Sequence, residues 1–320
     1  MDAGLRDVFI AAKDKSQYDM HAKKLLSQKS ILSHILAATV DEYQGMRPEE
    51  IEKYIEGEIY VGAVPIDPGL TNMARMEDGK KIAGINPFLE ESGEGWITCD
   101  IVFYVRMRDG VSKIIVNLEA QKDEPSGYDI LNRSIFYVCR LVSSQKERDF
   151  EGQRYNDLVR VYSIWVCMNM KECIWNYIHL TDEAIVASHH WKGKLDLLNI
   201  VLLGLPERIP EQKEYGLHRL LGALFDNRMS LGERMEILEQ EYQFESGAEF
   251  KEELEQMCNL GQGIWEKGVQ QGMQQGRAWE IIGISRDEGL SDERILARLQ
   301  SRLEISLDQA KEYLLGRQTA

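Results

Sequence analysis

The sequence predicts a mixed α/β fold, in which helices flank a mixed central sheet, followed by a helical C-terminal region. Two runs rich in β-branched and aromatic residues, 96–106 and 111–121, predict strands. Amphipathic patterns at 16–40 and 128–146 predict helices before and after them in the chain. From about residue 187 onward apolar residues recur mostly at helical spacing. A length of 320 residues suits one main domain with a smaller appendage.

The segment before these strands carries helical patterns and then loop signals. Residues 16–40 place leucines and isoleucines at helical spacing and predict one long amphipathic helix that ends near Gly45. Pro48, followed by two glutamates, suits the first turn of a short helix. Residues 58–64 predict a first strand or an extended approach to it. Residues 65–95, rich in Gly, Asp, Asn and Pro, predict a long loop or irregular insertion.

Asp109-Gly110, between the two β-rich runs, is a strong hairpin signal, because a type I′ turn needs positive φ at both central residues. If these two residues form the loop, Arg108 opposes Val111. Continuing that register gives one wholly apolar face, formed by the pairs Ile101–Leu118, Phe103–Val116 and Val105–Ile114.

The other face of the predicted hairpin carries acidic residues at its open end. Asp100 falls directly opposite Glu119, and Gln121 follows one pleat further along the strand. Cross-strand neighbours have Cβ atoms about 5 Å apart, so two carboxylates there repel each other unless one is protonated or a cation lies between them. The pair therefore predicts a shared divalent metal ion. The plain alternative is a solvent-facing polar edge on which both side chains are merely exposed.

The rest of the chain continues the alternation and then becomes helical. Residues 128–146 predict a helix and residues 159–167 a buried strand, so the order is helix, strand, hairpin, helix, strand. Three further helices are predicted at 195–205, 217–225 and 231–242. Two short helical patterns occupy the final part of the chain, and the second opens at Ser306.

Asp100, followed on the next strand by Glu119-Ala120-Gln121, resembles the PD-(D/E)XK nuclease superfamily, in which an Asp on one strand and a (D/E)-X-K triplet on the next bind magnesium. Residues 128–145 resemble the transposase-associated branch, the recombination-promoting nucleases of bacteria, in which Gln often replaces the motif lysine. The resemblance covers roughly the first half of the chain, together with a glycine-repeat tail typical of the branch. Two departures are Cys99 before the Asp, where the motif has Pro, and Gln121 in place of Lys.

This resemblance implies a restriction-endonuclease-like αβββαβ core and a metal-dependent DNA endonuclease linked to recombination or transposition of mobile elements. The implied catalytic residues are Asp100, Glu119 and Gln121, with Mg²⁺ or Mn²⁺ held by the two carboxylates. Glu42 is expected either as a third acidic ligand or as a surface charge near a helix end. The alternative function is a degenerate nuclease fold that binds DNA or a protein partner without cutting.

Basic residues near the predicted site are expected to contact DNA or to replace the missing lysine. Arg133, Tyr137 and Arg140 recur at i, i+4 and i+7, which predicts either a phosphate-contacting helix face or an ordinary exposed one. Lys122 and Lys113 are candidate surrogates for the lysine. Lys122, however, points to the opposite strand face, and Lys113 lies several residues down the strand.

Composition limits the function classes. A net charge of −15 argues against a general nucleic-acid coating protein but leaves room for a nuclease with a local basic groove. Five cysteines without a C-x-x-C pair, and an N-terminus unlike a signal peptide, predict reduced thiols in a cytoplasmic protein. The six histidines share no metal-ligand spacing, and no apolar stretch is expected to cross a membrane.

The glycines Gly268, Gly272 and Gly276 recur every four residues and would align on one helix face. This spacing predicts either a self-associating helix, which would make a homo-oligomer, or a flexible linker. The final segment is expected to be a helical hairpin rather than a helix-turn-helix DNA binder. The predicted organisation is a nuclease-like core at 1–185, a helical extension at 186–260, the glycine-repeat helix or linker at 261–280 and a small helical segment at 281–320.

Overall fold

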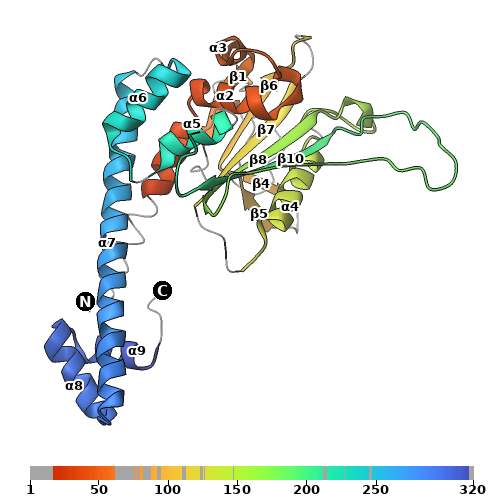
Figure 1. The fold of residues 1–320 in the computed structure, drawn as a ribbon. Helices are drawn as coiled ribbons and strands as arrows, with labels where there is room; N and C mark the ends of the chain where they lie inside the picture. Colours follow the sequence, from red (N-terminus) through yellow and green to blue (C-terminus); the bar gives the residue numbers. More distant parts are fainter. Residues whose placement is uncertain are drawn as a thin grey trace. The chain divides into compact units, whose positions relative to one another are not determined.

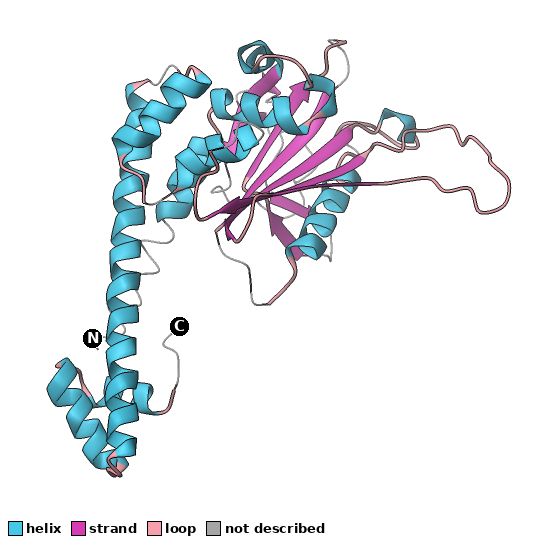
Figure 2. Cartoon of the chain, viewed as in Figure 1, coloured by secondary structure: helices cyan, strands magenta, loops and turns pink. Residues whose placement is uncertain are grey.

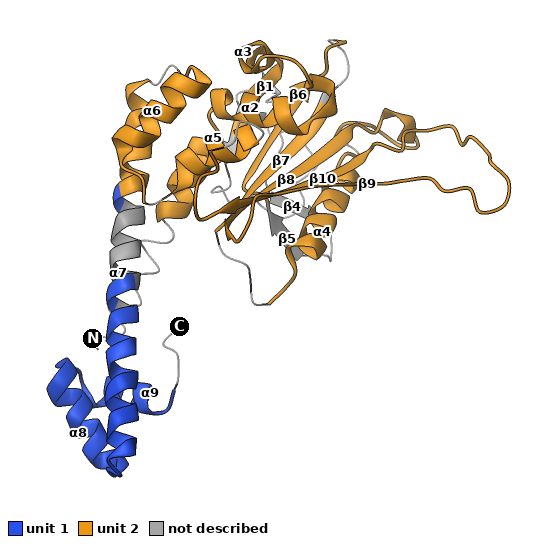
Figure 3. Ribbon diagram, viewed as in Figure 1, with its two compact units in different colours: residues 1–15, 259–320 blue, residues 16–258 orange. Residues whose placement is uncertain are grey.

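The computed structural model describes residues 17–61, 76–77, 80–81, 88–91, 95–109, 113–122, 125, 127–146, 148–211, 215–226, 228–244 and 247–316. Contacts divide the chain into two compact units, one of residues 16–258 and one of residues 1–15 and 259–320 (Figure 3). We call them the sheet unit and the C-terminal unit. The predicted loop at 65–95 lies mostly outside the described residues.

A six-stranded mixed sheet forms the centre of the sheet unit (Figure 1). Its strands, in spatial order, are β1 (Ile55–Val61), β6 (Ile101–Arg106), β7 (Lys113–Gln121), β8 (Arg160–Met170), β10 (Leu198–Pro206) and β9 (Ile174–His179). The first three strands are antiparallel, β7, β8 and β10 are parallel, and β9 is antiparallel to β10. Two short antiparallel pairs are β2 (Met76–Glu77) with β3 (Lys80–Lys81), and β4 (Phe88–Glu91) with β5 (Gly95–Thr98).

The predicted hairpin register is confirmed between β6 and β7. Ile101 pairs with Leu118, Phe103 with Val116 and Val105 with Ile114. Gly110 and Val111 of the predicted turn lie outside the described residues. A one-residue slip would have turned the apolar set to the opposite face, so burial of that set fixes the register.

Helices lie on both faces of the sheet (Figure 2). On one face, α4 (Ile130–Ser143) packs through Tyr137, Val138 and Leu141 against alternate strand residues such as Ile115 and Trp165. The intervening strand residues are equally buried on the side of α2 (Lys29–Thr39) and α5 (Gly216–Phe225). The remaining helical segments of the sheet unit are a first helix at 17–26, α3 (Pro48–Ile51), α6 (Leu231–Tyr242), the first turns of α7 (Ala248–Asp287), and 3₁₀ turns at Asp41–Tyr43, Glu52–Tyr54 and Tyr155–Asp157.

Two sequence predictions need correction here. The single helix expected over 16–40 is two helices, because the chain turns at Ser27 and continues through Gln28 with an extended backbone (φ −64°, ψ 130°). Residues 195–205, expected as a helix, contain strand β10, which pairs with both β8 and β9. A short apolar run fits a buried strand as well as a buried helix, and neighbouring strands on both sides decide the outcome. The sheet therefore continues past the predicted core boundary at residue 185.

The C-terminal unit has a small core of its own. The end of α7 packs with α8 (Asp292–Leu303) and α9 (Leu307–Leu314) through Ala278, Ile282, Ile295, Leu299 and Ala310. Ser306 caps α9 by accepting a hydrogen bond from the Gln309 backbone, which confirms the predicted helix start. The glycine repeat lies within α7, so its backbone is helical. Among the described residues, no helix is long and apolar enough to cross a membrane.

Candidate active site

Asp100 and Glu119 face each other where β6 begins and β7 nears its end. The Asp100 backbone N–H donates to Glu119 Oε1 at 3.1 Å. In return, the Ala120 backbone N–H donates to Asp100 Oδ2 at 3.0 Å. These reciprocal bonds hold both carboxylates at the carboxyl end of β7, the edge at which open sheets with parallel strands usually carry their ligand sites.

Glu119 is nearly fully buried, with 2% of its surface exposed. Burial raises the pKa of its carboxyl well above the usual range, and the negative charge of Asp100 raises it further. The Asp100 backbone N–H, the Arg133 charge and the Asn117 amide lower it by smaller amounts. Glu119 therefore holds its proton to a higher pH than an exposed glutamate, unless a cation enters the site.

Lys23, on the first helix, provides a positive charge that the sequence did not point to. Its Nζ lies 2.8 Å from Asp100 Oδ1 and 2.8 Å from Asp19 Oδ2. The side chains of Lys23 and Asp100 are only 16% and 13% exposed. Burial lowers the pKa of Lys23, but the charge and hydrogen bond of Asp100, helped by Asp19, more than offset this and leave the pKa raised. Asp100 is thus paired with an ammonium group.

Arg133 provides a second positive charge, on the Glu119 side of the pair. Its guanidinium donates to the hydroxyls of Tyr128 at 2.6 Å and Tyr137 at 2.8 Å. The central carbon of the guanidinium also lies 5.3 Å from the centre of the Trp165 ring. Trp165, on β8, is the residue that pairs with Glu119 of β7. Tyrosine hydroxyls and an indole face therefore hold Arg133 in place next to a buried carboxyl group.

A buried group of hydrogen-bonded side chains lies beside Glu119 and consists of Asn117, Ser163 and Trp165. Asn117 Nδ2 donates to Ser163 Oγ at 3.3 Å, and Trp165 Nε1 donates to the same oxygen at 2.9 Å. Asn117 Oδ1 is buried without a hydrogen-bond partner, which is uncommon for a native side-chain oxygen. Asn117 and Glu119 share one strand face, so this oxygen is a further polar atom on the face that carries the site.

The structure places the other residues of the predicted triplet region differently. Gln121 pairs in register with Cys167, one pleat beyond Glu119 on the same strand face. Lys122 Nζ lies 4.3 Å from the centre of the Tyr18 ring, over the first helix. Lys113 pairs with Arg106 at the far end of the hairpin.

Glu42 does not join Asp100 and Glu119, which corrects the expectation of a third acidic ligand. Its Oε2 lies 4.0 Å from Arg160 Nη1, at the start of β8. Arg160 pairs with Ile114, so at about 3.3 Å per residue it lies roughly 16 Å along the strands from the level of Glu119. The chain after α2 turns to the opposite end of the sheet from the carboxylate pair.

The predicted phosphate-contacting face of α4 is also corrected. Tyr137 and Arg140 are buried, at 6% and 5% exposure, and Arg133 is half-buried. Tyr137 packs against Trp165 of the sheet, and Arg140 is buried as well, so this side of the helix is not the exposed face that the spacing predicts.

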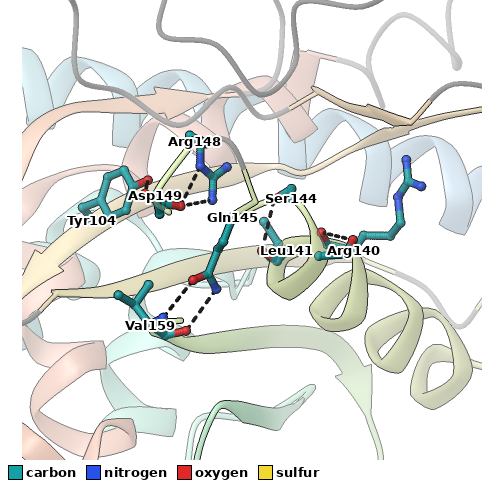
Figure 4. Close-up of polar contacts among 9 residues, drawn as sticks. Tyr104, Arg140, Leu141, Ser144, Gln145, Arg148, Asp149 and Val159 are labelled. Atoms are coloured by element: carbon teal, nitrogen blue, oxygen red, sulfur yellow. Dashed lines mark hydrogen bonds and ion pairs between the residues drawn. The ribbon is translucent and has the colours of Figure 1, made fainter. Parts of the chain in front are cut away.

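The segment after α4 fixes this helix against β8 (Figure 4). The Gln145 side chain donates from Nε2 to the Val159 carbonyl at 3.0 Å and accepts from the Val159 N–H at 2.8 Å. Asp149 accepts from the Tyr104 hydroxyl at 2.5 Å and from Arg148 Nε at 2.8 Å. The fully buried Gln145 side chain thus bonds both backbone groups of Val159, and it anchors the end of the helix that carries Arg133.

The carboxylates of Asp100 and Glu119, with the amide oxygen of Asn117 on the same strand face as Glu119, are the kinds of oxygen atom that a hard divalent cation prefers. Magnesium is usually held by one or two protein carboxylates together with water and substrate phosphate, not by a complete protein cage. Within the described ranges, no group of three or more His, Cys, Asp and Glu side chains could hold a metal ion. Asp100 and Glu119 thus offer two carboxylates, which is fewer protein ligands than a complete protein cage would supply.

Sequence reasoning missed Lys23, Asn117 and Trp165. Asn117 could have been found, because it lies two residues before Glu119 and must share its face. Trp165 required the parallel register of β8, which no local pattern gives. Lys23 required the packing of a distant helix, and its only local signal is the i, i+4 spacing to Asp19.

Comparison of the chain with models of protein families, with curated proteins and with solved structures gave no match.

Proposed function

We propose that this protein is a metal-dependent DNA endonuclease that hydrolyses phosphodiester bonds at the Asp100–Glu119 pair, in the recombination or transposition of mobile elements. The observation that carries the proposal is a buried glutamate held against a second carboxylate by reciprocal backbone hydrogen bonds. Burying two adjacent acidic groups costs stability, and a divalent cation offsets that cost. Resemblance of the same residues to the PD-(D/E)XK nucleases supplies the reaction class and the DNA substrate.

Each residue has a role in this proposal. Asp100 and Glu119 would hold Mg²⁺ or Mn²⁺, which when bound supplies Lewis-acid polarisation of phosphate and a more acidic water. Gln121, on the same strand face, would orient the attacking water through its amide. Arg133, fixed by two tyrosine hydroxyls, would balance the negative charge that phosphate brings to Glu119. Five free cysteines support a reducing compartment, the bacterial cytoplasm.

Nicking of supercoiled plasmid DNA tests the proposal. The full chain should convert supercoiled to open-circular DNA with Mg²⁺ or Mn²⁺ and not with EDTA. Asp100→Ala should remove the activity, while Glu236→Ala, on the exposed face of α6, should not. Equal nicking by the Asp100→Ala variant would show a contaminating nuclease and remove the support for this site.

A second function, DNA or protein binding without cleavage, is favoured by a different observation. The two acidic groups already have basic neighbours, Lys23 at Asp100 and Arg133 near Glu119, and Gln121 replaces the motif lysine. A binder would shift DNA in a gel equally well in Mg²⁺ and in EDTA and would leave plasmid intact in both. A nuclease should bind more tightly with Ca²⁺ than with EDTA, because the cation bridges carboxylate and phosphate.

A further inference from the structure

We infer that Lys23, on the first helix, supplies the positive charge at the carboxylate pair that Gln121 cannot supply from the strand. This inference rests on the proposed endonuclease function. It assigns to a helix residue the contact with the phosphate bound at Asp100. No residue of the triplet on β7 supplies this positive charge, because the triplet ends in the neutral amide of Gln121.

The position of Lys23 supports this role. Its Nζ lies at 2.8 Å from Asp100 Oδ1, on the oxygen that does not accept from Ala120. The ammonium therefore already occupies the side of Asp100 that the strand backbone leaves open. A phosphate oxygen brought to the same carboxylate would lie within reach of one of its three N–H groups.

The first helix holds Lys23 firmly, so its charge is preorganised. Ala22 and Leu26 are buried, at 1% and 0% exposure, on either side of it in the sequence. The Tyr18 hydroxyl donates to the Phe225 carbonyl at 3.4 Å, which ties the same helix to the end of α5. A fixed charge needs less reorganisation during the reaction than a mobile surface lysine.

The other described basic groups near the pair do not form an ion pair with Asp100. Lys122 lies over the Tyr18 ring, and Arg133 is held by two tyrosine hydroxyls on the Glu119 side. Lys24, the next residue, pairs with Glu253 at 2.8 Å and not with Asp100. Of the described basic side chains, Lys23 is the one that forms an ion pair with a carboxylate of the site.

Single-turnover cleavage and Mg²⁺ affinity, measured on the full chain, test the inference. Lys23→Met should lower the cleavage rate about 100-fold or more, the effect typical of removing one group that stabilises transition-state charge. Its Mg²⁺ affinity, measured by calorimetry, should stay equal or rise, because the ammonium no longer competes for Asp100. Lys24→Met removes a comparable ion pair one residue away and should change neither quantity.

A second substitution separates the catalytic role from a structural one. Gln121 shares the strand face of Glu119, so Gln121→Lys should place an ammonium at the same site and restore cleavage at least about tenfold in the Lys23→Met background. A purely structural ion pair would give no such rescue, and its loss would weaken Mg²⁺ binding and lower the melting temperature together.

The outcomes also separate this inference from the proposed function. If the wild-type chain cleaves with Mg²⁺ and Lys23→Met matches Lys24→Met, the Lys23 role is wrong and the endonuclease stands. The Lys23 role is equally wrong if Gln121→Lys fails to rescue. If the wild-type chain shows no Mg²⁺-dependent cleavage, the proposed function is wrong and the role of Lys23 is wrong with it.

Discussion

Replacing Glu119 by Gln should stabilise the metal-free protein at neutral pH. The substitution keeps the acceptor for the Asp100 N–H and removes an ionisable group from a side chain that is only 2% exposed. Burial, and then the Asp100 charge, raise the pKa of this carboxyl in the folded state. The unfolded chain, with a glutamate pKa of about 4.3, releases the proton more readily, so ionisation of Glu119 favours unfolding.

The size and the pH dependence of the effect follow from that linkage. Each tenfold difference in proton affinity between the folded and unfolded states changes the free energy of unfolding by about 1.4 kcal/mol. For a domain the size of the sheet unit, a change of about 1 kcal/mol shifts the melting temperature by about 2–4 °C. The Gln variant should therefore melt at least about 3 °C higher at pH 7 in EDTA. Glu119 contributes its full stability below the unfolded pKa and loses it as pH rises through the folded pKa. The two proteins should accordingly converge near pH 4 and diverge as pH increases.

Thermal unfolding followed by circular dichroism from pH 4 to 8, in EDTA, measures this difference. Glu236→Gln is the matched control, since that glutamate is exposed on α6 and should change stability by less than about 0.5 kcal/mol. A Glu119→Gln variant that is less stable than wild type at pH 7, or a difference that is flat across this range, would refute a burial-raised pKa at Glu119.

Three further predictions concern the strand triplet, the helix anchor and the tail. Gln121→Leu should abolish cleavage while Gln121→Lys retains or increases it, because only the leucine lacks a polar group to position water; wild-type rates in the leucine variant would place Gln121 outside the chemistry. Gln145→Leu should lower the free energy of unfolding by about 2 kcal/mol or more in urea titrations, because it orphans the Val159 N–H and carbonyl; a Ser144→Ala control loses the one side-chain hydrogen bond to the Leu141 carbonyl and should cost less. A chain truncated before Gly261 should stay folded and should keep its metal response while its oligomeric mass falls; equal masses by light scattering would leave the tail as a tether.

The part of the site that local sequence predicts is the part formed by one hairpin. The Asp109-Gly110 sequence signal and the alternation of side chains predict which residues oppose each other, so the Asp100–Glu119 pairing follows from neighbouring residues alone. The same logic covers Asn117. These features depend on backbone geometry over a few residues, which is why the sequence predicts them.

The part that local sequence does not predict depends on packing between distant segments. Lys23 reaches Asp100 only because the first helix packs in the sheet unit, and Glu42 is carried to the opposite end of the sheet by the turn after α2. Strand β10 has the composition of a buried helix, and its neighbours β8 and β9 make it a strand. Arg140 fits an exposed basic stripe by spacing, yet its helix face is buried.

Direct titration of Mn²⁺ into the metal-free protein, with free Mn²⁺ followed by electron paramagnetic resonance, tests the claim that Asp100 and Glu119 share a divalent cation. The wild-type chain should bind Mn²⁺, and Mg²⁺ should displace it. Asp100→Asn and Glu119→Gln should each abolish binding, because either change removes one of the two carboxylate ligands. Unchanged Mn²⁺ binding in both variants would contradict the shared site and, with it, the proposed metal-dependent cleavage at this pair.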